Sequence, residues 1–326
     1  MQRNNAATPT EKHPRVIESL ADGLSLALAR PWLLIVPMLL DLYYWLGWKV
    51  SVASLASPIG DWILRQDQAE SADVSQGITS LGRADSTQLV AALTPSLLVG
   101  APGNDIYSFI ERTRLTPDHW AIATLLLAGF MIGACLLHMV FVVPLADAAI
   151  DRIRTPRATA SAIARAWWRS ICLHLTVVGI GALLLGPAMI ASLAMIVVGL
   201  DPTPLLGIAA LGFSAAVFLV WWFALKAIAV NDVGPLRALK YGFMVVRNRL
   251  WSVIGFVAAW LLLSFGLGQL WLEIASSAPG LLVGVIANAF FAAGVTMAGM
   301  IFYRRSIESI LSLAANPAGR ATRRNN

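Results

Sequence analysis

Six long apolar runs restrict what this chain can fold into. An α-helix rises about 1.5 Å per residue, so about 20 residues cross the roughly 30 Å hydrocarbon core of a bilayer. A helix also satisfies its own backbone hydrogen bonds, which lipid cannot do. We therefore predict an all-α, polytopic bundle of about six transmembrane helices, with spans near 31–50, 120–146, 170–198, 204–229, 251–275 and 280–303.

The composition agrees with a membrane protein. The chain is 58% hydrophobic and only 13% charged, whereas soluble domains have about 25% charged residues. Its mean hydropathy is +0.71. The net charge of +6 does not indicate nucleic acid, because the basic residues are scattered among the spans without interleaved aromatic residues. It indicates membrane topology and contact with anionic lipid headgroups.

The positions of the basic residues orient the chain, because short loops rich in Lys and Arg stay cytoplasmic. Nineteen of the 24 lie in four segments. These are Arg3, Lys12, Arg15 and Arg30; Arg152, Arg154, Arg157, Arg165 and Arg169; Lys226, Arg237, Lys240, Arg247 and Arg249; and Arg304, Arg305, Arg320, Arg323 and Arg324. We expect a multi-pass protein of the bacterial cytoplasmic (inner) membrane with both termini in the cytoplasm.

The chain divides into three parts on this interpretation. Residues 1–30 form a cytoplasmic tail and an amphipathic helix, 31–303 a single membrane domain, and 304–326 a basic cytoplasmic tail. Within 16–30, fourfold spacing predicts a helix on the inner surface, and a plain extension of the first span is an open alternative. The residues at this spacing are Val16, Leu20, Leu24 and Leu28. The extracytoplasmic loop 51–118 is expected to cap the outer mouth of the bundle.

The two larger inner connections resemble each other when Pro156 is aligned on Pro235. In each, a span ends, a proline opens a short amphipathic helix, and an Arg/Trp cluster begins the next span. Proline in the first turn of a helix sacrifices no hydrogen bond. Each helix is expected to lie along the inner surface. An internal repeat and convergence on a common loop pattern both remain open.

The stretch 231–251, which begins Asn231-Asp232-Val233-Gly234-Pro235, resembles the motif of a broad group of bacterial multi-span proteins. That group includes the membrane domain of glycerophosphoryl diester phosphodiesterases. The segment 30–42 is similar to the opening of multi-span relatives. The resemblance implies a six-helix bundle without phosphodiesterase activity, because in that family the activity belongs to a separate soluble barrel whose motifs this chain lacks.

Ionisable residues inside spans are functional candidates because they are costly to bury in lipid. Asp41 lies deep in the first span and would relay a proton, bind a cation or serve as a buried structural acid. Asp147 and Lys226 occupy matching places near the inner ends of the second and fourth spans. They suggest an interhelical ion pair, and snorkelling of each to the interface is the alternative.

His138 and His174 are expected at similar depth, close in sequence to Cys135 and Cys172. The two thiols would differ in depth by roughly 13 Å on straight helices, which tetrahedral coordination does not accommodate. Core histidines are therefore favoured, and no metal or other cofactor is predicted.

Two helices carry features of packing. Residues in the sixth span recur at fourfold spacing, which predicts close internal packing with Asn288 bonding across to a neighbour. They are Gly280, Gly284, Asn288, Ala292 and Thr296. Gly186-Pro187 is expected to kink the third span.

The sequence names no reaction, since zincin, nucleophile-elbow, P-loop and dinucleotide-binding signatures are lacking. The favoured function is a non-catalytic scaffold or accessory component. The expected partners are the bilayer, anionic headgroups at the cytoplasmic face and other membrane proteins, with no nucleic acid. A transporter or permease for a small solute or ion using Asp41 is the alternative, and an intramembrane enzyme is third.

Overall fold

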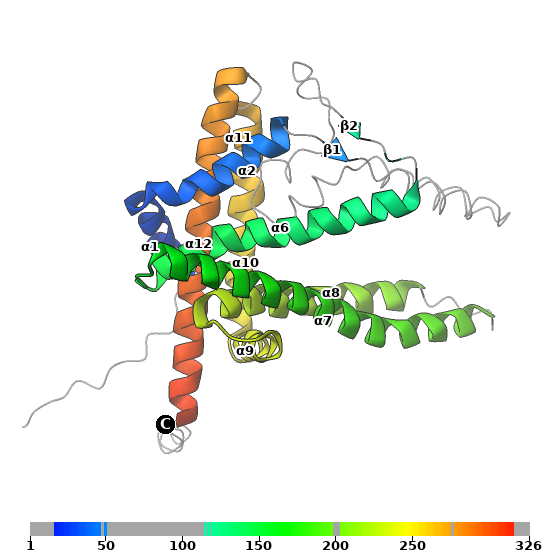
Figure 1. Cartoon of the computed structure of the whole chain (residues 1–326). Coiled ribbons are helices and arrows are strands. Elements are labelled where there is room, and N and C mark those ends of the chain that lie inside the picture. Colours follow the sequence, from blue (N-terminus) through cyan, green and yellow to red (C-terminus); the bar gives the residue numbers. More distant parts are fainter. Residues whose placement is uncertain are drawn as a thin grey trace, which may run out of the picture.

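The computed structural model has the all-α fold that the sequence predicts (Figure 1). It describes residues 16–46, 49–50, 114–115, 117, 119–197, 203–274 and 277–315. The helices are α1 (Val16–Ala29), η1 (Pro31–Leu34), α2 (Ile35–Leu46), α6 (Trp120–Ala149), α7 (Pro156–Val197), α8 (Thr203–Asn231), α9 (Pro235–Asn248), α10 (Leu250–Leu261), η3 (Leu262–Gly266), α11 (Leu267–Ile274) and α12 (Ala278–Ala315). The two-residue strands β1 (Lys49–Val50) and β2 (Arg114–Leu115) pair in parallel. Most of the predicted loop 51–118 and the terminal tails lie outside the described residues.

Five described helices are long and apolar enough to cross a membrane, so the chain is a multi-pass membrane protein. A sixth span exists only if α1 and the η1–α2 segment, bent by 98°, count as one. Within the first span predicted at 31–50, η1 and α2 together cover Pro31–Leu46, so this segment counts as a span only together with α1. The bend falls at Arg30-Pro31 because proline lacks an N–H and disfavours helical geometry in the residue before it.

The two inner connections differ in one respect that the sequence does not reveal. Pro156 and Pro235 each begin a helix, as predicted. However, α7 is one continuous helix of 42 residues that passes through Pro187, so its first turns are no separate surface helix. In contrast, α9 is separate from α10, because Arg249 between them leaves helical geometry with φ −133° and ψ 33°.

The last two predicted spans also differ from their predicted form. The fifth is interrupted by the π-helical turn η3, which inserts a wider turn between α10 and α11. The sixth continues as α12 to Ala315, twelve residues beyond the predicted end at 303. The basic residues Arg304 and Arg305 therefore lie on a helix and not in a tail.

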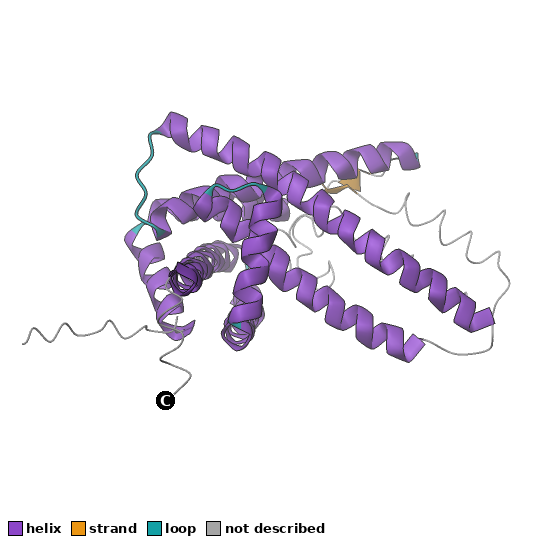
Figure 2. Cartoon of the chain, turned by 90° about the horizontal axis from the view of Figure 1, so that it is seen from below, coloured by secondary structure: helices purple, strands orange, loops and turns teal. Residues whose placement is uncertain are grey.

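Buried side chains gather at one end of α6, α7 and α8, where these helices meet α12. The largest fully buried ones include Tyr303, Phe141, Phe223, Phe256 and Phe302. The opposite halves of α6, α7 and α8 extend away from α12 in Figures 1 and 2. Their apolar side chains are largely exposed, as Leu125, Leu183 and Leu211 illustrate. This exposed apolar surface suits lipid chains.

Small residues allow α1 to pack closely against α12. The buried side of α1 consists of Ser19, Gly23 and Ala27 at fourfold spacing. Of the larger residues predicted to define this helix, Val16 and Leu20 are partly buried against the core, whereas Leu28 is 70% exposed. A Cβ atom at Gly23 would lie 2.3 Å from the Gly294 carbonyl oxygen, so the two backbones touch there.

Candidate functional site

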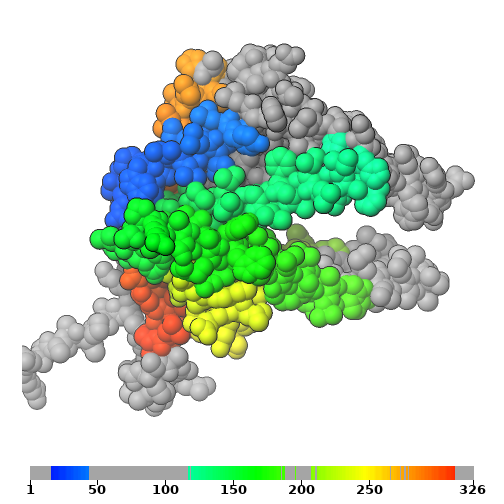
Figure 3. Space-filling model, viewed as in Figure 1, coloured from blue at the N-terminus to red at the C-terminus, as the bar shows by residue number. Residues whose placement is uncertain are grey.

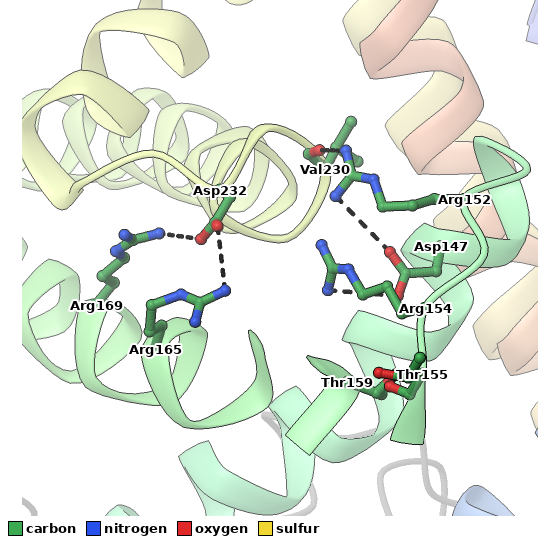
Figure 4. Close-up of polar contacts among 9 residues, drawn as sticks. All are labelled: Asp147, Arg152, Arg154, Thr155, Thr159, Arg165, Arg169, Val230 and Asp232. Atoms are coloured by element: carbon green, nitrogen blue, oxygen red, sulfur yellow. Dashed lines mark hydrogen bonds and ion pairs between the residues drawn. The ribbon is translucent and has the colours of Figure 1, made fainter. Parts of the chain in front are cut away.

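Acidic and basic side chains gather where α6, α7, α8 and α9 meet. We call this region the basic face and define it by α1, residues 147–169, residues 226–249 and the last turns of α12. Asp232 directly follows α8 and accepts hydrogen bonds from Arg165 and Arg169 of α7 (Figure 4). One carboxylate therefore holds two guanidinium groups and ties the end of α8 to α7.

A second carboxylate has a similar role at the end of α6. Asp147 is 7% exposed, and its two oxygens lie 3.8 Å from Arg152 and 3.4 Å from Arg154 (Figure 4). Arg152 also donates a hydrogen bond of 2.9 Å to the carbonyl oxygen of Val230 in α8. The connection after α6 is therefore anchored to both α6 and α8.

Two further ion pairs join α1 to the rest of the basic face. Arg30 lies 3.1 Å from Asp151, in the connection after α6. Arg305 of α12 lies 2.7 Å from Asp22 of α1. Both pairs are well exposed, and such pairs contribute little to stability, typically less than about 1 kcal/mol. They orient the elements more than they stabilise them.

The two connections share a backbone feature, although the alignment of Pro156 on Pro235 does not place its residues opposite each other. Asp151 and Asp232 both have φ of 52°, the left-handed region that an aspartate tolerates better than most residues. Each follows the end of a long helix, and a proline-started helix follows each. Each also pairs with arginine from earlier in the chain. The two connections are thus alike in this left-handed aspartate, which lies five residues before Pro156 in one and three residues before Pro235 in the other.

Asp41 and Asn288, two of the intramembrane candidates, contact each other. The Asn288 side-chain amide donates a hydrogen bond of 2.8 Å to the Asp41 carboxyl group, which joins α2 to α12. The expected bond from Asn288 to a neighbouring helix is therefore confirmed. Asp41 is 0% exposed, so a water-sized sphere does not reach it.

Lys226 does not pair with Asp147, so the predicted ion pair is wrong. Its ammonium group lies 3.2 Å from the ring centroid of Trp222, one turn earlier in α8. Among the described residues it forms no ion pair, although it is only 7% exposed. The sequence alignment overlooked Arg152 and Arg154, which already neutralise Asp147 from within the same connection.

Lys226→Met is expected to raise the melting temperature of the protein in detergent. Burying an unpaired ammonium costs several kcal/mol, whereas its contact with an indole in a desolvated site returns about 2 kcal/mol. The exposed Lys240→Met should leave the melting temperature nearly unchanged. A lower melting temperature for Lys226→Met would show that the ammonium has a stabilising partner.

His138 and His174 line one small cavity together with Cys135, Ser170, Trp221 and Leu225. The cavity volume is about 10 Å³, which is the size that holds one water molecule. His174 Nδ1 donates to the Ser170 carbonyl oxygen over 2.6 Å, and its ring meets Trp221 edge-on. Cys172 does not line the cavity. No group of three His, Cys, Asp or Glu side chains in the described residues could hold a metal.

Several residues that organise this region were not singled out from the sequence. Arg152, Arg154, Arg165 and Arg169 entered only as signals of topology, and Asp232 only as part of a motif. A usable signal existed, since each large connection has an aspartate three to five residues before its helix-starting proline. Nothing in the pattern indicated which arginine each aspartate would bind.

Comparisons with protein-family models, with curated proteins and with solved structures give no match for this chain. The resemblance of 231–251 to the phosphodiesterase membrane domain therefore stays a prediction.

Proposed function

We propose that this protein is a non-catalytic scaffold or accessory component of the bacterial cytoplasmic membrane, with its basic face in the cytoplasm. The proposal rests on one observation, the burial and hydrogen bonding of Asp41. This acid is 0% exposed and bonded to Asn288. A group that relays protons or binds a passing cation needs contact with water or solute, and a buried, bonded acid instead holds two helices together.

The other ionisable candidates support the same function. Asp147 is held by two arginines, and Lys226 rests on Trp222. Both contacts are local: Trp222 lies in the same helix as Lys226, and Arg152 and Arg154 lie in the connection that follows Asp147. Each group is therefore engaged within the protein. Orientation follows from the same arginines, because segments rich in Lys and Arg are retained in the cytoplasm.

Thiol labelling at position 41 tests the proposal. In a background with Cys135→Ala and Cys172→Ala, Asp41→Cys is expected to resist a small membrane-impermeant thiol reagent in sealed proteoliposomes and in detergent. The reason is that no water reaches this site. Lys240→Cys, on the exposed side of α9, should react completely in detergent and serves as the positive control.

Labelling of a folded Asp41→Cys protein from the aqueous phase would contradict the proposal and favour the transporter. Because Asp41→Cys also removes a hydrogen-bond acceptor, Asn288→Cys provides a second position at the same contact. A monodisperse profile in size-exclusion chromatography establishes that each variant is folded. Reaction at both positions would indicate an aqueous pathway between α2 and α12.

A further inference from the structure

The helix α9 has one side buried in the protein and one side exposed. Ala238, Gly242 and Val245 form its buried side. A Cβ atom at Gly242 would lie 2.4 Å from the Val220 carbonyl oxygen, so the backbone of α9 rests directly on α8. The helix is therefore held rigidly, with a fixed set of side chains turned outward.

Basic and apolar residues alternate along that exposed side. It carries Leu236, Arg237, Lys240, Phe243 and Arg247, which we call the α9 strip. The order Leu236, Lys240, Phe243 and Arg247 follows the spacing of one helix face. Leu236 is 73% exposed and Phe243 is 52% exposed, and Trp251, just beyond α9, is 82% exposed.

The cations of the α9 strip differ from most arginines of the basic face in their pairing with carboxylates. Among the described residues, seven other arginines have a carboxylate within 4 Å: Arg30, Arg152, Arg154, Arg165, Arg169, Arg304 and Arg305. In contrast, Arg237, Lys240 and Arg247 have neither an ion pair nor a side-chain hydrogen bond within the part of the chain that the structure describes. Three adjacent cations are thus left for an external anion.

The placement of α9 fits a membrane surface. Figure 1 shows α9 nearly end-on, whereas the spans α10 and α12 run in the plane of the view, so α9 lies across them. In Figure 3 its yellow atoms form part of the molecular surface beside the last turns of α12. A helix with exposed apolar residues among Lys and Arg is typical of the headgroup region of a bilayer.

We infer that the α9 strip binds the phosphodiester headgroups of anionic phospholipids in the adjoining leaflet. Arg237, Lys240 and Arg247 contact the phosphates, while Leu236 and Phe243 enter the boundary with the acyl chains. The inference rests on the proposed function in one respect, that the basic face lies at the cytoplasmic leaflet, whose lipids are anionic. An acidic protein segment would match the charges but leaves the exposed apolar residues without a role.

The test is phospholipid binding to the full-length protein. Native mass spectrometry in neutral detergent would compare phosphatidylglycerol with phosphatidylcholine for the wild type and for Arg237→Gln/Lys240→Gln/Arg247→Gln. Each charge near an anionic surface is worth about fivefold in affinity, so the triple variant should lose phosphatidylglycerol binding on the order of a hundredfold. Binding of phosphatidylcholine should be the same for both proteins.

Two matched variants sharpen the test. Arg237→Lys/Arg247→Lys keeps the charges and should retain phosphatidylglycerol binding. Arg157→Gln removes an exposed arginine from α7, outside the strip, and should have little effect. A loss of about fivefold from Arg157→Gln, the value expected for any one charge, would overturn the assignment to α9, since diffuse charge would then suffice.

A further comparison separates lipid from protein. Leu236→Ser/Phe243→Ser should weaken phosphatidylglycerol binding while keeping its salt dependence, because only the apolar contacts are lost. Unchanged lipid binding in the triple variant, with loss of binding to an acidic peptide, would overturn the inference. Neither result depends on position 41, so failure here is distinguishable from failure of the proposed scaffold function.

Discussion

Gly23→Ala is expected to lower the free energy of unfolding by about 3 kcal/mol, the upper end of what overpacking usually causes. The added Cβ atom would lie 2.3 Å from the Gly294 carbonyl oxygen and 2.5 Å from the Ala298 nitrogen. Both atoms belong to the backbone of α12, so no side chain can turn aside. We expect α1 to be pushed away from α12. Thermal unfolding in detergent would measure the loss, with a thiol-reactive dye reporting exposure of the buried Cys135.

The matched control for this variant is Gly129→Ala in α6, where an added Cβ atom meets nothing within 4 Å. Alanine is a better helix former than glycine by about 1 kcal/mol, so this variant should be as stable as wild type or more so. If Gly23→Ala also unfolded like the wild type, the close contact between α1 and α12 would be disproved.

Asp147→Ala is expected to lower the free energy of unfolding by about 3–5 kcal/mol, the usual loss when one partner of a buried ion pair is removed. The side chains of Asp147 and Arg154 are 10% and 14% exposed, so the guanidinium would be left largely buried without its acid. Thermal unfolding in detergent again provides the measurement.

A double-mutant cycle tests which base matters to Asp147. Combining Asp147→Ala with Arg154→Met should be less harmful than the sum of the two single changes, because both act on one interaction. Combining Asp147→Ala with Lys226→Met should give additive effects. Additive losses with Arg154 and coupling to Lys226 would instead restore the ion pair expected from the sequence.

The spans were predictable because each depends on local composition. The run that became α8 was placed at 204–229, and the helix extends over Thr203–Asn231. Pro156 and Pro235 were recognised as helix starts for an equally local reason. The first predicted span is the exception, because η1 and α2 together end at Leu46 and are shorter than the about 20 residues that cross the bilayer core. The end of α12 was misjudged because charged residues stop an apolar run but do not stop a helix.

Several residues of the candidate site were predictable from the sequence, whereas the contacts between them were predictable only in part. Asp41 and Asn288 were singled out separately, since a polar residue in a span is conspicuous wherever its partner lies. Their contact joins residues 247 positions apart, and no spacing rule reaches that far. Asp147 was assigned to Lys226 by alignment, whereas it binds Arg152 and Arg154 in the connection that directly follows it.

The sequence by itself determined that this chain is a membrane protein. The reason is that each segment can cross the bilayer if that segment alone is long and apolar enough. It also concentrated the basic residues at one face. Only the tertiary structure decided which of these charges are neutralised within the protein and which stay available on α9. The reason is that the strength of an ion pair depends on separation and burial in space, and both are set by how helices distant in sequence pack.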